Sequence, residues 1–199
     1  MISKEIVVDG KDHIAGKLGS FIAKHLLEGY TIKVVNADLV VFNRSLKKAV
    51  EWYKDYLRKK SRINPLRGPF HYHEPSKLFF RVVKRMVQYQ IKKGKNALSR
   101  LTIFEGIPQD LIDTEFMMCP TAMRGVGRTF PDKKFCSFGQ LCSRIGWKHG
   151  KLLDEIRKEQ ESIIQRKKSE MEAKQKEINE IRSSVAFQRE VNDLISKIE

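Results

Sequence analysis

The sequence predicts an α/β fold, and three observations near its start carry that prediction. A short β-branched run at residues 5–8 ends at the turn pair Asp9-Gly10. An amphipathic stretch follows it. A second β-branched run occupies residues 31–35. A strand, a helix and a strand at this spacing form a parallel pair joined by a right-handed crossover.

The amphipathic stretch is predicted to be a helix because apolar residues recur on one face, at Leu18, Phe21, Ile22 and Leu26. Gly29 follows this set and suits the C-cap of the helix, where a left-handed backbone is common. Beyond the second strand, a third short strand is expected at residues 39–42.

Two further helices are predicted between residues 45 and 89, with a loop between them. The first has an apolar face formed by Leu46, Ala49, Val50, Tyr53 and Leu57. Pro65 ends any helix before it, and we expect residues 64–69 to form an extended or turning loop. The second helix is predicted to begin near Pro75, with an apolar set Phe79, Val82, Val83 and Met86 and an opposite, cationic set Lys77, Arg81, Lys84 and Arg85.

The remaining chain falls into an irregular part and a helical part. We expect a basic turn at 92–95, a short helix at 96–101, a strand at 102–104 and mostly loop over 109–134. Residues 151–199 contain neither Gly nor Pro, and Ile164, Met171, Ile178 and Val185 recur every seven residues. This predicts one long helix, or two with a break at 183–184. The chain is therefore divided into an α/β core, 1–150, and a helical extension, 151–199.

The positive charge is concentrated in one segment. The chain has 39 Lys and Arg against 24 Asp and Glu, a net charge of +15. Residues 44–100 alone hold 17 basic and 3 acidic side chains, a net +14, whereas residues 153–199 hold 10 and 11. Such a density repels itself unless a polyanion or counterions neutralise it. Nucleic acid is the leading partner class, ahead of an acidic membrane surface.

Several other classes are disfavoured by the sequence. The apolar runs are far shorter than the roughly 18 residues of a transmembrane helix, and the first residues lack the apolar core of a signal peptide. A phosphate-binding loop is not predicted at Gly10 to Gly16-Lys17, because five residues separate the glycines and Leu18 stands where Ser or Thr is needed. We therefore expect no nucleotide cofactor.

Metal binding and thiol catalysis are also not expected. His71-Tyr72-His73 with Glu74 has no second ligand pair at zinc-like spacing. The three cysteines, Cys119, Cys136 and Cys142, form no CxxC pair and are predicted to be buried apolar groups in a reducing compartment.

The basic segment is the strongest candidate for a binding site. Aromatic rings and guanidinium planes stack on unpaired bases, and cationic helices follow phosphates. Phe70 and Tyr72 lie among these cations and fit either a stacking role or a place in the core. The candidate RNA-binding residues are Arg58, Lys59, Lys60, Arg62, Arg67, His71, His73, Lys77, Arg81, Lys84, Arg85, Lys92, Lys93, Lys95, Arg124, Arg128, Lys133 and Lys134.

The loop and the second basic helix carry a family signature. Residues 64–71 read Asn-Pro-Leu-Arg-Gly-Pro-Phe-His, and Pro-Ser-Lys at 75–77 and Phe-Arg-Val-Val-Lys-Arg-Met at 80–86 follow. Together with Phe-Glu-Gly-Ile-Pro at 104–108, Pro-Thr-Ala-Met-Arg at 120–124 and Gly-Trp-Lys at 146–148, this sequence resembles large-subunit ribosomal protein thirteen, in the eukaryotic branch of that family.

The resemblance implies a three-layer α/β core with a small parallel sheet flanked by helices and a C-terminal helical extension. It implies a non-enzymatic role in translation, namely binding and stabilising large-subunit rRNA through the segment at about 44–100 and contacting neighbouring ribosomal proteins. It also implies the cytoplasmic ribosome as location, with assembly in the nucleolus, and no metal, cofactor, membrane or small-molecule substrate. Six residues at motif positions inherit the RNA-contact expectation: Arg67, His71, Lys77, Arg81, Lys84 and Arg85.

The chain departs from the family pattern at three places. Arg85 and the pair at 88–89 stand where the family usually has Gly and Pro-His. A loop that is Lys-rich in many relatives contains Asp110, Asp113 and Glu115 here. The extension is neutral rather than basic, which shifts its expected partner from RNA toward protein.

Two other function classes share some of these features. An RNA-modifying or nucleotide-using enzyme would need a cofactor loop that the sequence does not show. A DNA-binding chromatin protein would need an element that presents base-reading side chains to the major groove.

Overall fold

A computed structural model describes residues 5–126 and 133–183 of the chain. Its centre is a three-stranded parallel sheet in the order β1-β2-β4, formed by β1 (Glu5–Asp9), β2 (Thr31–Val35) and β4 (Leu101–Ile103). Glu5 lies opposite Thr31, and Ile32 lies opposite Leu101. The predicted α/β class and the parallel pairing of the first two strands are confirmed. In this order β4 is an edge strand.

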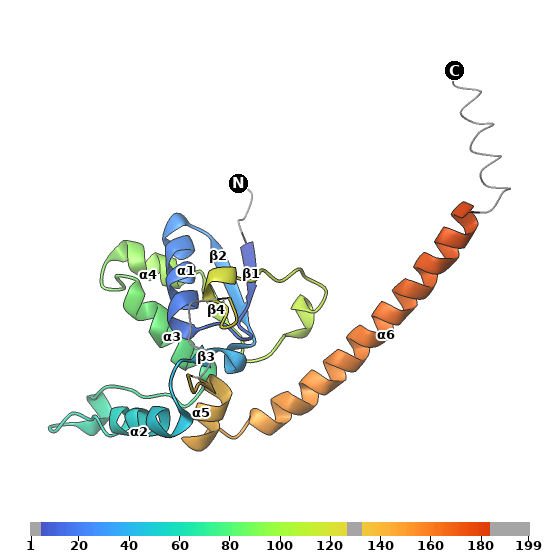
Figure 1. Cartoon of the computed structure of the whole chain (residues 1–199). Helices are drawn as coiled ribbons and strands as arrows, with labels where there is room; N and C mark the ends of the chain where they lie inside the picture. The colour runs from blue at the N-terminus through green and yellow to red at the C-terminus, as the bar shows by residue number, and fades with distance from the viewer. Residues whose placement is uncertain (1–4, 127–132, 184–199) are drawn as a thin grey trace. The chain divides into compact units, whose positions relative to one another are not determined.

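Three helices lie together on one side of this sheet: α1 (Ala15–Glu28), α3 (Pro75–Met86) and α4 (Lys92–Leu98) (Figure 1). Leu18, Ile22 and Leu26 of α1 are fully buried, as their spacing predicts. The helix ends at Gly29, whose φ of +103° is readily adopted only by glycine. The predicted C-cap is thus confirmed.

A second, two-stranded sheet pairs β3 (Val41–Phe42) with β5 (Cys136–Ser137) in antiparallel fashion. The strand predicted at 39–42 is shorter than expected, because Ala37–Leu39 forms a 3-10 turn. Helix α2 (Leu46–Leu57) follows β3 in the chain, and helix α5 (Phe138–Arg144) follows β5.

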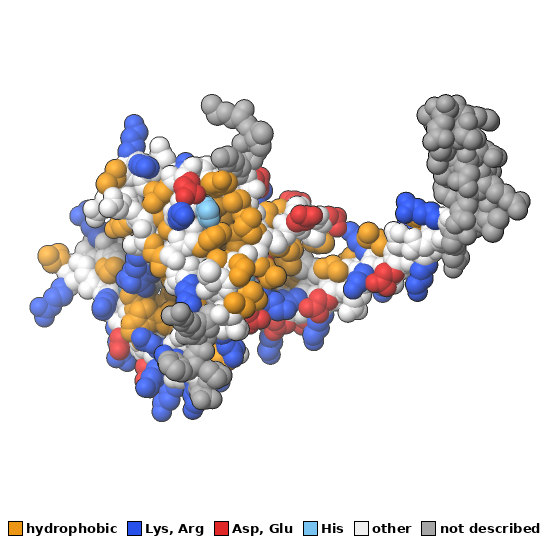
Figure 2. Space-filling model, turned by 45° about the horizontal axis from the view of Figure 1, so that its top comes forward, with side chains coloured by type: hydrophobic (Ala, Val, Ile, Leu, Met, Phe, Trp, Pro, Cys, Tyr) orange, Lys and Arg blue, Asp and Glu red, His pale blue; other side chains and the backbone are white. Residues whose placement is uncertain are grey.

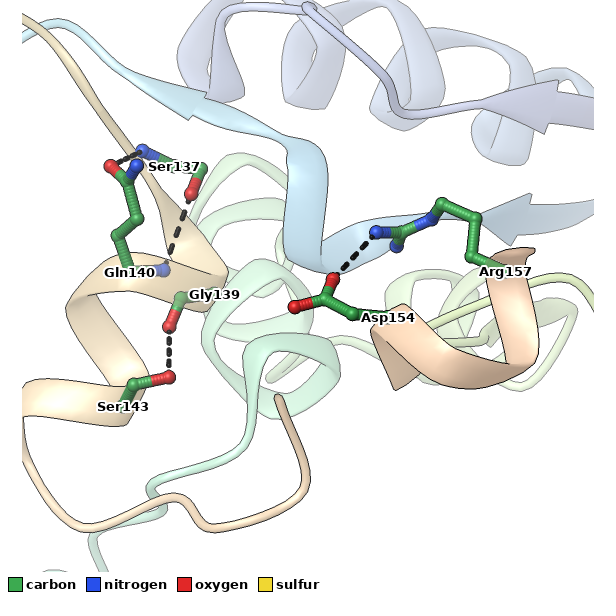
Figure 3. A network of polar contacts seen from close by, with 6 residues as sticks. All are labelled: Ser137, Gly139, Gln140, Ser143, Asp154 and Arg157. Carbon is green, nitrogen blue, oxygen red and sulfur yellow. Dashed lines mark hydrogen bonds and ion pairs between the residues drawn. The ribbon is translucent and has the colours of Figure 1, made fainter. Parts of the chain in front are cut away.

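Helix α5 is absent from the sequence-based prediction, although it begins with a clear signal. The backbone N–H of Gln140 donates to Ser137 Oγ at 3.2 Å, and the N–H of Ser137 donates to Gln140 Oε1 at 3.3 Å (Figure 3). This reciprocal capping box fixes the start of the helix. Ser143 Oγ donates to the carbonyl of Gly139 at 2.8 Å within the same helix.

The core contains most of the apolar residues predicted for it, but the buried face of α3 differs from the prediction. Tyr53, Phe79 and Phe138 are its largest fully buried side chains, and the three cysteines are buried with free thiols, as predicted. In α3, however, Leu78 is buried while Met86, predicted to lie in the core, is 42% exposed. The reason is that the helix ends at Met86 and the chain turns there.

The prediction for residues 92–101 was wrong in its boundaries. Residues 92–95 are not a basic turn but the first half of α4, which ends at Leu98 and not at residue 101. The strand predicted at 102–104 is confirmed one residue earlier, at Leu101–Ile103, where it pairs with β2. Gly94 is buried in α4 because the backbone of Gln88 passes close to it. A Cβ at Gly94 would lie 2.0 Å from the Gln88 carbonyl oxygen. Gly94 therefore allows the backbone of Gln88 to lie close to α4, and it does not form a turn.

The chain divides into two units, residues 1–153 and 154–199. Helix α6 (Gly150–Ser183) confirms the predicted long C-terminal helix as far as residue 183. Val185, the break predicted at 183–184 and the second apolar stripe from Phe187 lie wholly or partly outside the described residues. In the parts of the chain that the structure describes, no helix has the length and apolar character that crossing a membrane requires.

Basic and acidic side chains alternate along α6 (Figure 2). Arg157 pairs with Asp154 at 3.1 Å (Figure 3), and Lys168 approaches Glu172 at 3.9 Å. Ile164, Met171 and Ile178 of the predicted seven-residue stripe are 45%, 71% and 44% exposed.

Replacing Gly94 by alanine tests the close approach of α4 to the preceding linker. Because the Cβ would overlap backbone and not a flexible side chain, we expect Gly94→Ala to lower the free energy of unfolding by about 1–3 kcal/mol. The matched control is Gly16→Ala in α1, where a Cβ meets nothing within 4 Å. Alanine there should leave stability unchanged or raise it by up to about 1 kcal/mol. Urea unfolding followed by circular dichroism measures both, and equal effects would contradict this role of Gly94.

Candidate nucleic-acid interface

The loop between α2 and α3 is fixed by two tyrosines of α2. Tyr53 is only 2% exposed, and its hydroxyl donates to the backbone carbonyl of Tyr72 at 2.5 Å. One helical turn later, the Tyr56 hydroxyl donates to the carbonyl of Phe70 at 3.5 Å. The core thus holds the backbone of the loop at two positions, two residues apart.

His71, between these two positions, is also engaged within the loop. Its Nε2 lies 2.7 Å from the carbonyl oxygen of Lys59, so this nitrogen donates the hydrogen bond. Its ring packs edge-on against Tyr56, with ring centroids 4.1 Å apart. His71 is half-buried, whereas the neighbouring side chains of Phe70 and Tyr72 are 69% and 53% exposed. The question left open by the sequence is settled, since neither ring belongs to the core.

Burial keeps the central tyrosine neutral. It raises the pKa of Tyr53 to about 12, with smaller contributions from Cys142 and Tyr56. Burial likewise raises the pKa of the Cys142 thiol to about 12. A low-polarity site disfavours the charged form of both groups, so Tyr53 stays a hydrogen-bond donor over the physiological range.

A cleft of about 520 Å³ opens between this loop, α3 and the edge strand β4. Aromatic rings and three cations line it, together with the three residues of β4. The lining residues are Tyr53, Tyr56, Phe70, Tyr72, Ser76, Lys77, Leu78, Phe80, Arg81, Lys84, Leu101, Thr102 and Ile103.

The three cations of the cleft rest on aromatic rings. The Arg81 guanidinium lies 3.5 Å from the ring centroid of Tyr56. Lys77 Nζ lies 5.9 Å from the Tyr72 ring, and Lys84 Nζ lies 4.4 Å from the Tyr89 ring. Burial lowers the pKa of Arg81, yet an arginine remains protonated in a protein. Over the described ranges none of the three forms an ion pair with a carboxylate, so their charges remain available to an anion.

The other predicted RNA-binding residues lie around this cleft and beyond it. Arg58, at the end of α2, pairs with Asp55 at 3.5 Å. Arg124, half-buried, packs its guanidinium 3.3 Å from the ring centroid of Phe135. Arg128 lies outside the described residues. The remaining candidates are exposed on the loop (Lys59, Lys60, Arg62, Arg67, His73), near the end of α3 (Arg85), on α4 (Lys92, Lys93, Lys95) and before β5 (Lys133, Lys134).

The structure therefore joins some of the predicted residues and separates others. Lys77, Arg81 and Lys84 share one cleft, whereas the α4 lysines follow the opposite end of α3 from the loop (Figure 1). On the face shown in Figure 2, Lys and Arg side chains project around the margin of the first unit. Among the residues that the structure describes, no three His, Cys, Asp or Glu side chains gather into a group that could hold a metal ion.

Sequence reasoning missed the residues that complete the cleft. Tyr53 is predicted as core, which is correct, but its bond to the loop is not predicted. Tyr56 and Thr102 are absent from the candidate set. The aromatic cluster at 52–56 is a visible signal for Tyr56, whereas only the sheet order brings Thr102 beside α3.

Comparison with known proteins gives concordant results. Residues 3–110 match the family model described as Ribosomal protein L13, a range that includes both basic helices and their loop. The large ribosomal subunit protein uL13 of Caenorhabditis elegans is 37% identical over 145 residues, which cover 73% of this chain and 71% of that protein. The protein of the same name from Drosophila melanogaster is 32% identical over 164 residues, covering 82% and 80%.

Deprotonation of the buried Tyr53 is expected to destabilise the fold at alkaline pH. Its pKa is about 12 in the folded chain against an ordinary value near 10, so the folded state binds this proton more tightly. The protonated Tyr53 therefore contributes about 2–3 kcal/mol to the free energy of unfolding. This contribution is fully present below about pH 10 and is lost as the pH rises toward 12. The Cys142 thiol adds a loss of the same sign between about pH 9 and 12.

We expect Tyr53→Phe to show a weaker alkaline loss than the unchanged chain. At neutral pH the variant should be less stable by about 0.5–1.5 kcal/mol, because the Tyr72 carbonyl loses its donor. Urea unfolding at several pH values between 8 and 11.5 measures the slope for both proteins. Identical slopes would show that Tyr53 titrates as an ordinary, exposed phenol.

Proposed function

Since this chain belongs to the ribosomal protein L13 family and is a structural constituent of the large ribosomal subunit, we propose that its basic helix-loop-helix segment at about 44–100 binds and stabilises large-subunit rRNA. The family is one of ribosomal structural proteins and not of enzymes. The alternative of an enzyme built on the first strand-helix-strand unit is therefore set aside.

The observation that carries the proposal is the state of the cations in the cleft. Lys77, Arg81 and Lys84 are supported by aromatic rings and are not paired with carboxylates in the described structure. A cation held in place but not neutralised is suited to a phosphate, because little side-chain freedom remains to be lost on binding. Exposed loop cations such as Arg62 and Arg67 extend the same positive surface.

His71 has a different part in this proposal. Its ring is bonded to the Lys59 carbonyl and packed on Tyr56, so it positions the loop and does not approach phosphate directly. The sequence grouped it with the RNA-contacting residues, and we assign it instead to the support of Phe70 and Tyr72.

The helical extension is proposed to contact protein. Residues 153–199 carry 10 basic and 11 acidic side chains, which gives no net attraction to a polyanion. The exposed stripe that includes Ile164, Met171 and Ile178 supplies an apolar surface for a neighbouring large-subunit protein. We further expect the chain in cytoplasmic ribosomes, after assembly in the nucleolus.

Charge reversal within the cleft tests the RNA-binding segment. We expect Lys77→Glu with Lys84→Glu to prevent incorporation into large subunits, as measured by sucrose-gradient sedimentation of tagged protein from cells. With a purified rRNA fragment, every phosphate that the variant no longer neutralises should make the slope of log K against log salt shallower by about 0.7–0.9. Arg81 is left unchanged because its guanidinium packs on Tyr56.

The matched control reverses the same charge outside the segment. Lys17 and Lys24 are exposed on α1, and Lys17→Glu with Lys24→Glu should be incorporated like the unchanged chain. Circular dichroism should show both variants folded. If the cleft variant enters large subunits as well as its control does, the segment is not the rRNA-binding surface.

A further inference from the structure

The backbone beside the exposed rings of Phe70 and Tyr72 is bonded to α2. The carbonyls of these two residues accept hydrogen bonds from Tyr56 and Tyr53, while their own side chains point away from the core with 69% and 53% exposure. A chain that fixes the backbone of two aromatic residues and leaves both rings in solvent presents a preformed stacking surface.

The dimensions of the cleft suit a small planar group. Its volume of about 520 Å³ lies within the range of about 300–1,000 Å³ that is typical of ligand pockets. Its walls combine aromatic rings with Lys77, Arg81 and Lys84, a composition that matches a flat base joined to a negatively charged backbone. A purely apolar peptide would leave these three charges without partners.

The third wall adds polar groups that could read a base edge. β4 is an edge strand of the sheet, and Leu101, Thr102 and Ile103 all line the cleft. An edge strand carries backbone N–H and C=O groups that do not pair within the sheet. Thr102 is exposed there, and its hydroxyl is both a donor and an acceptor.

We propose that this cleft receives one unpaired nucleotide of the RNA, whose base stacks on Phe70 and Tyr72 while the cations neutralise its phosphates. The proposal rests on the proposed rRNA-binding function and makes it more specific. The segment then distinguishes RNA with an unpaired nucleotide from a regular helix, in which every base is stacked and paired and cannot enter.

Binding of two RNA probes to the full chain tests the proposal. One probe is a blunt RNA duplex, and the other is the same duplex with a single bulged adenosine; fluorescence anisotropy at one salt concentration measures both. We expect tighter binding of the bulged probe. Tyr72→Ala and Phe70→Ala should each weaken it about tenfold and change duplex binding much less, because stacking on a base is removed while the cations that neutralise the phosphates remain.

Two control variants separate stacking from other effects. Tyr72→Phe keeps the ring and should retain the preference for the bulge. Tyr89→Ala removes a similarly exposed ring, 41% against 53%, that supports Lys84 but does not line the cleft. It should weaken the binding of both probes alike and so retain the preference for the bulge. Thermal unfolding should show all four variants folded.

The binding results distinguish failure of the nucleotide pocket from failure of the RNA-binding function. Equal affinity of the unchanged chain for both probes, or an unchanged bulge preference in Tyr72→Ala and Phe70→Ala, would overturn the nucleotide pocket while leaving the basic segment as an RNA-binding surface. Absence of binding to either probe would overturn both this inference and the proposed function.

Discussion

The hydrogen bond from the buried Tyr53 hydroxyl to the Tyr72 carbonyl is the constraint on which the candidate site depends. It links the core to a loop that has neither helix nor strand around residue 72, across 19 positions of sequence. Without it, the loop would have to be ordered by exposed contacts alone, which rarely overcome the entropy of fixing a backbone. With it, the backbone beside Phe70 and Tyr72 is tied to the core.

The same arrangement explains how the fold tolerates its charge. A segment with a net charge of +14 would repel itself, but most of its cations lie on the surface, and several of them pack against aromatic rings. Cation–π contacts orient a charge without neutralising it. An ion pair such as that of Arg58 with Asp55, at the end of α2, does the opposite. The surface therefore keeps its positive potential where the cleft lies.

Much of the fold could be predicted because it obeys simple periodicities. The alternation of β-branched runs and an amphipathic helix predicts β1, α1 and β2, and the spacing of apolar residues predicts α2 and α3. One error arises because the role of a residue is decided by a tertiary contact and not by its residue type. Gly94 suggests a turn by its type, yet it lies inside α4 because Gln88 passes beside it. Helix α5 is short, and its Ser137–Gln140 capping signal is easily overlooked.

The candidate site could be predicted in composition but not in geometry. The density of Lys and Arg identifies the segment, and the family resemblance identifies its loop. No sequence pattern could show that Tyr53 and Tyr56 hold the backbone of the loop, since those hydrogen bonds join residues 19 and 14 positions apart. Equally, β4 becomes a wall of the cleft only through the sheet order β1-β2-β4, which depends on long-range pairing.

Ultraviolet cross-linking measures directly whether the segment at about 44–100 touches the rRNA of the large subunit. Purified large subunits would be irradiated with ultraviolet light, digested with nuclease and protease, and the peptides of this chain that carry a nucleotide identified by mass spectrometry. We expect cross-linked peptides from the α2–α3 loop and α3, with nucleotides attached at or near Phe70 and Tyr72. Cross-links confined to α6, with none between residues 44 and 100, would show that the basic segment does not touch the rRNA.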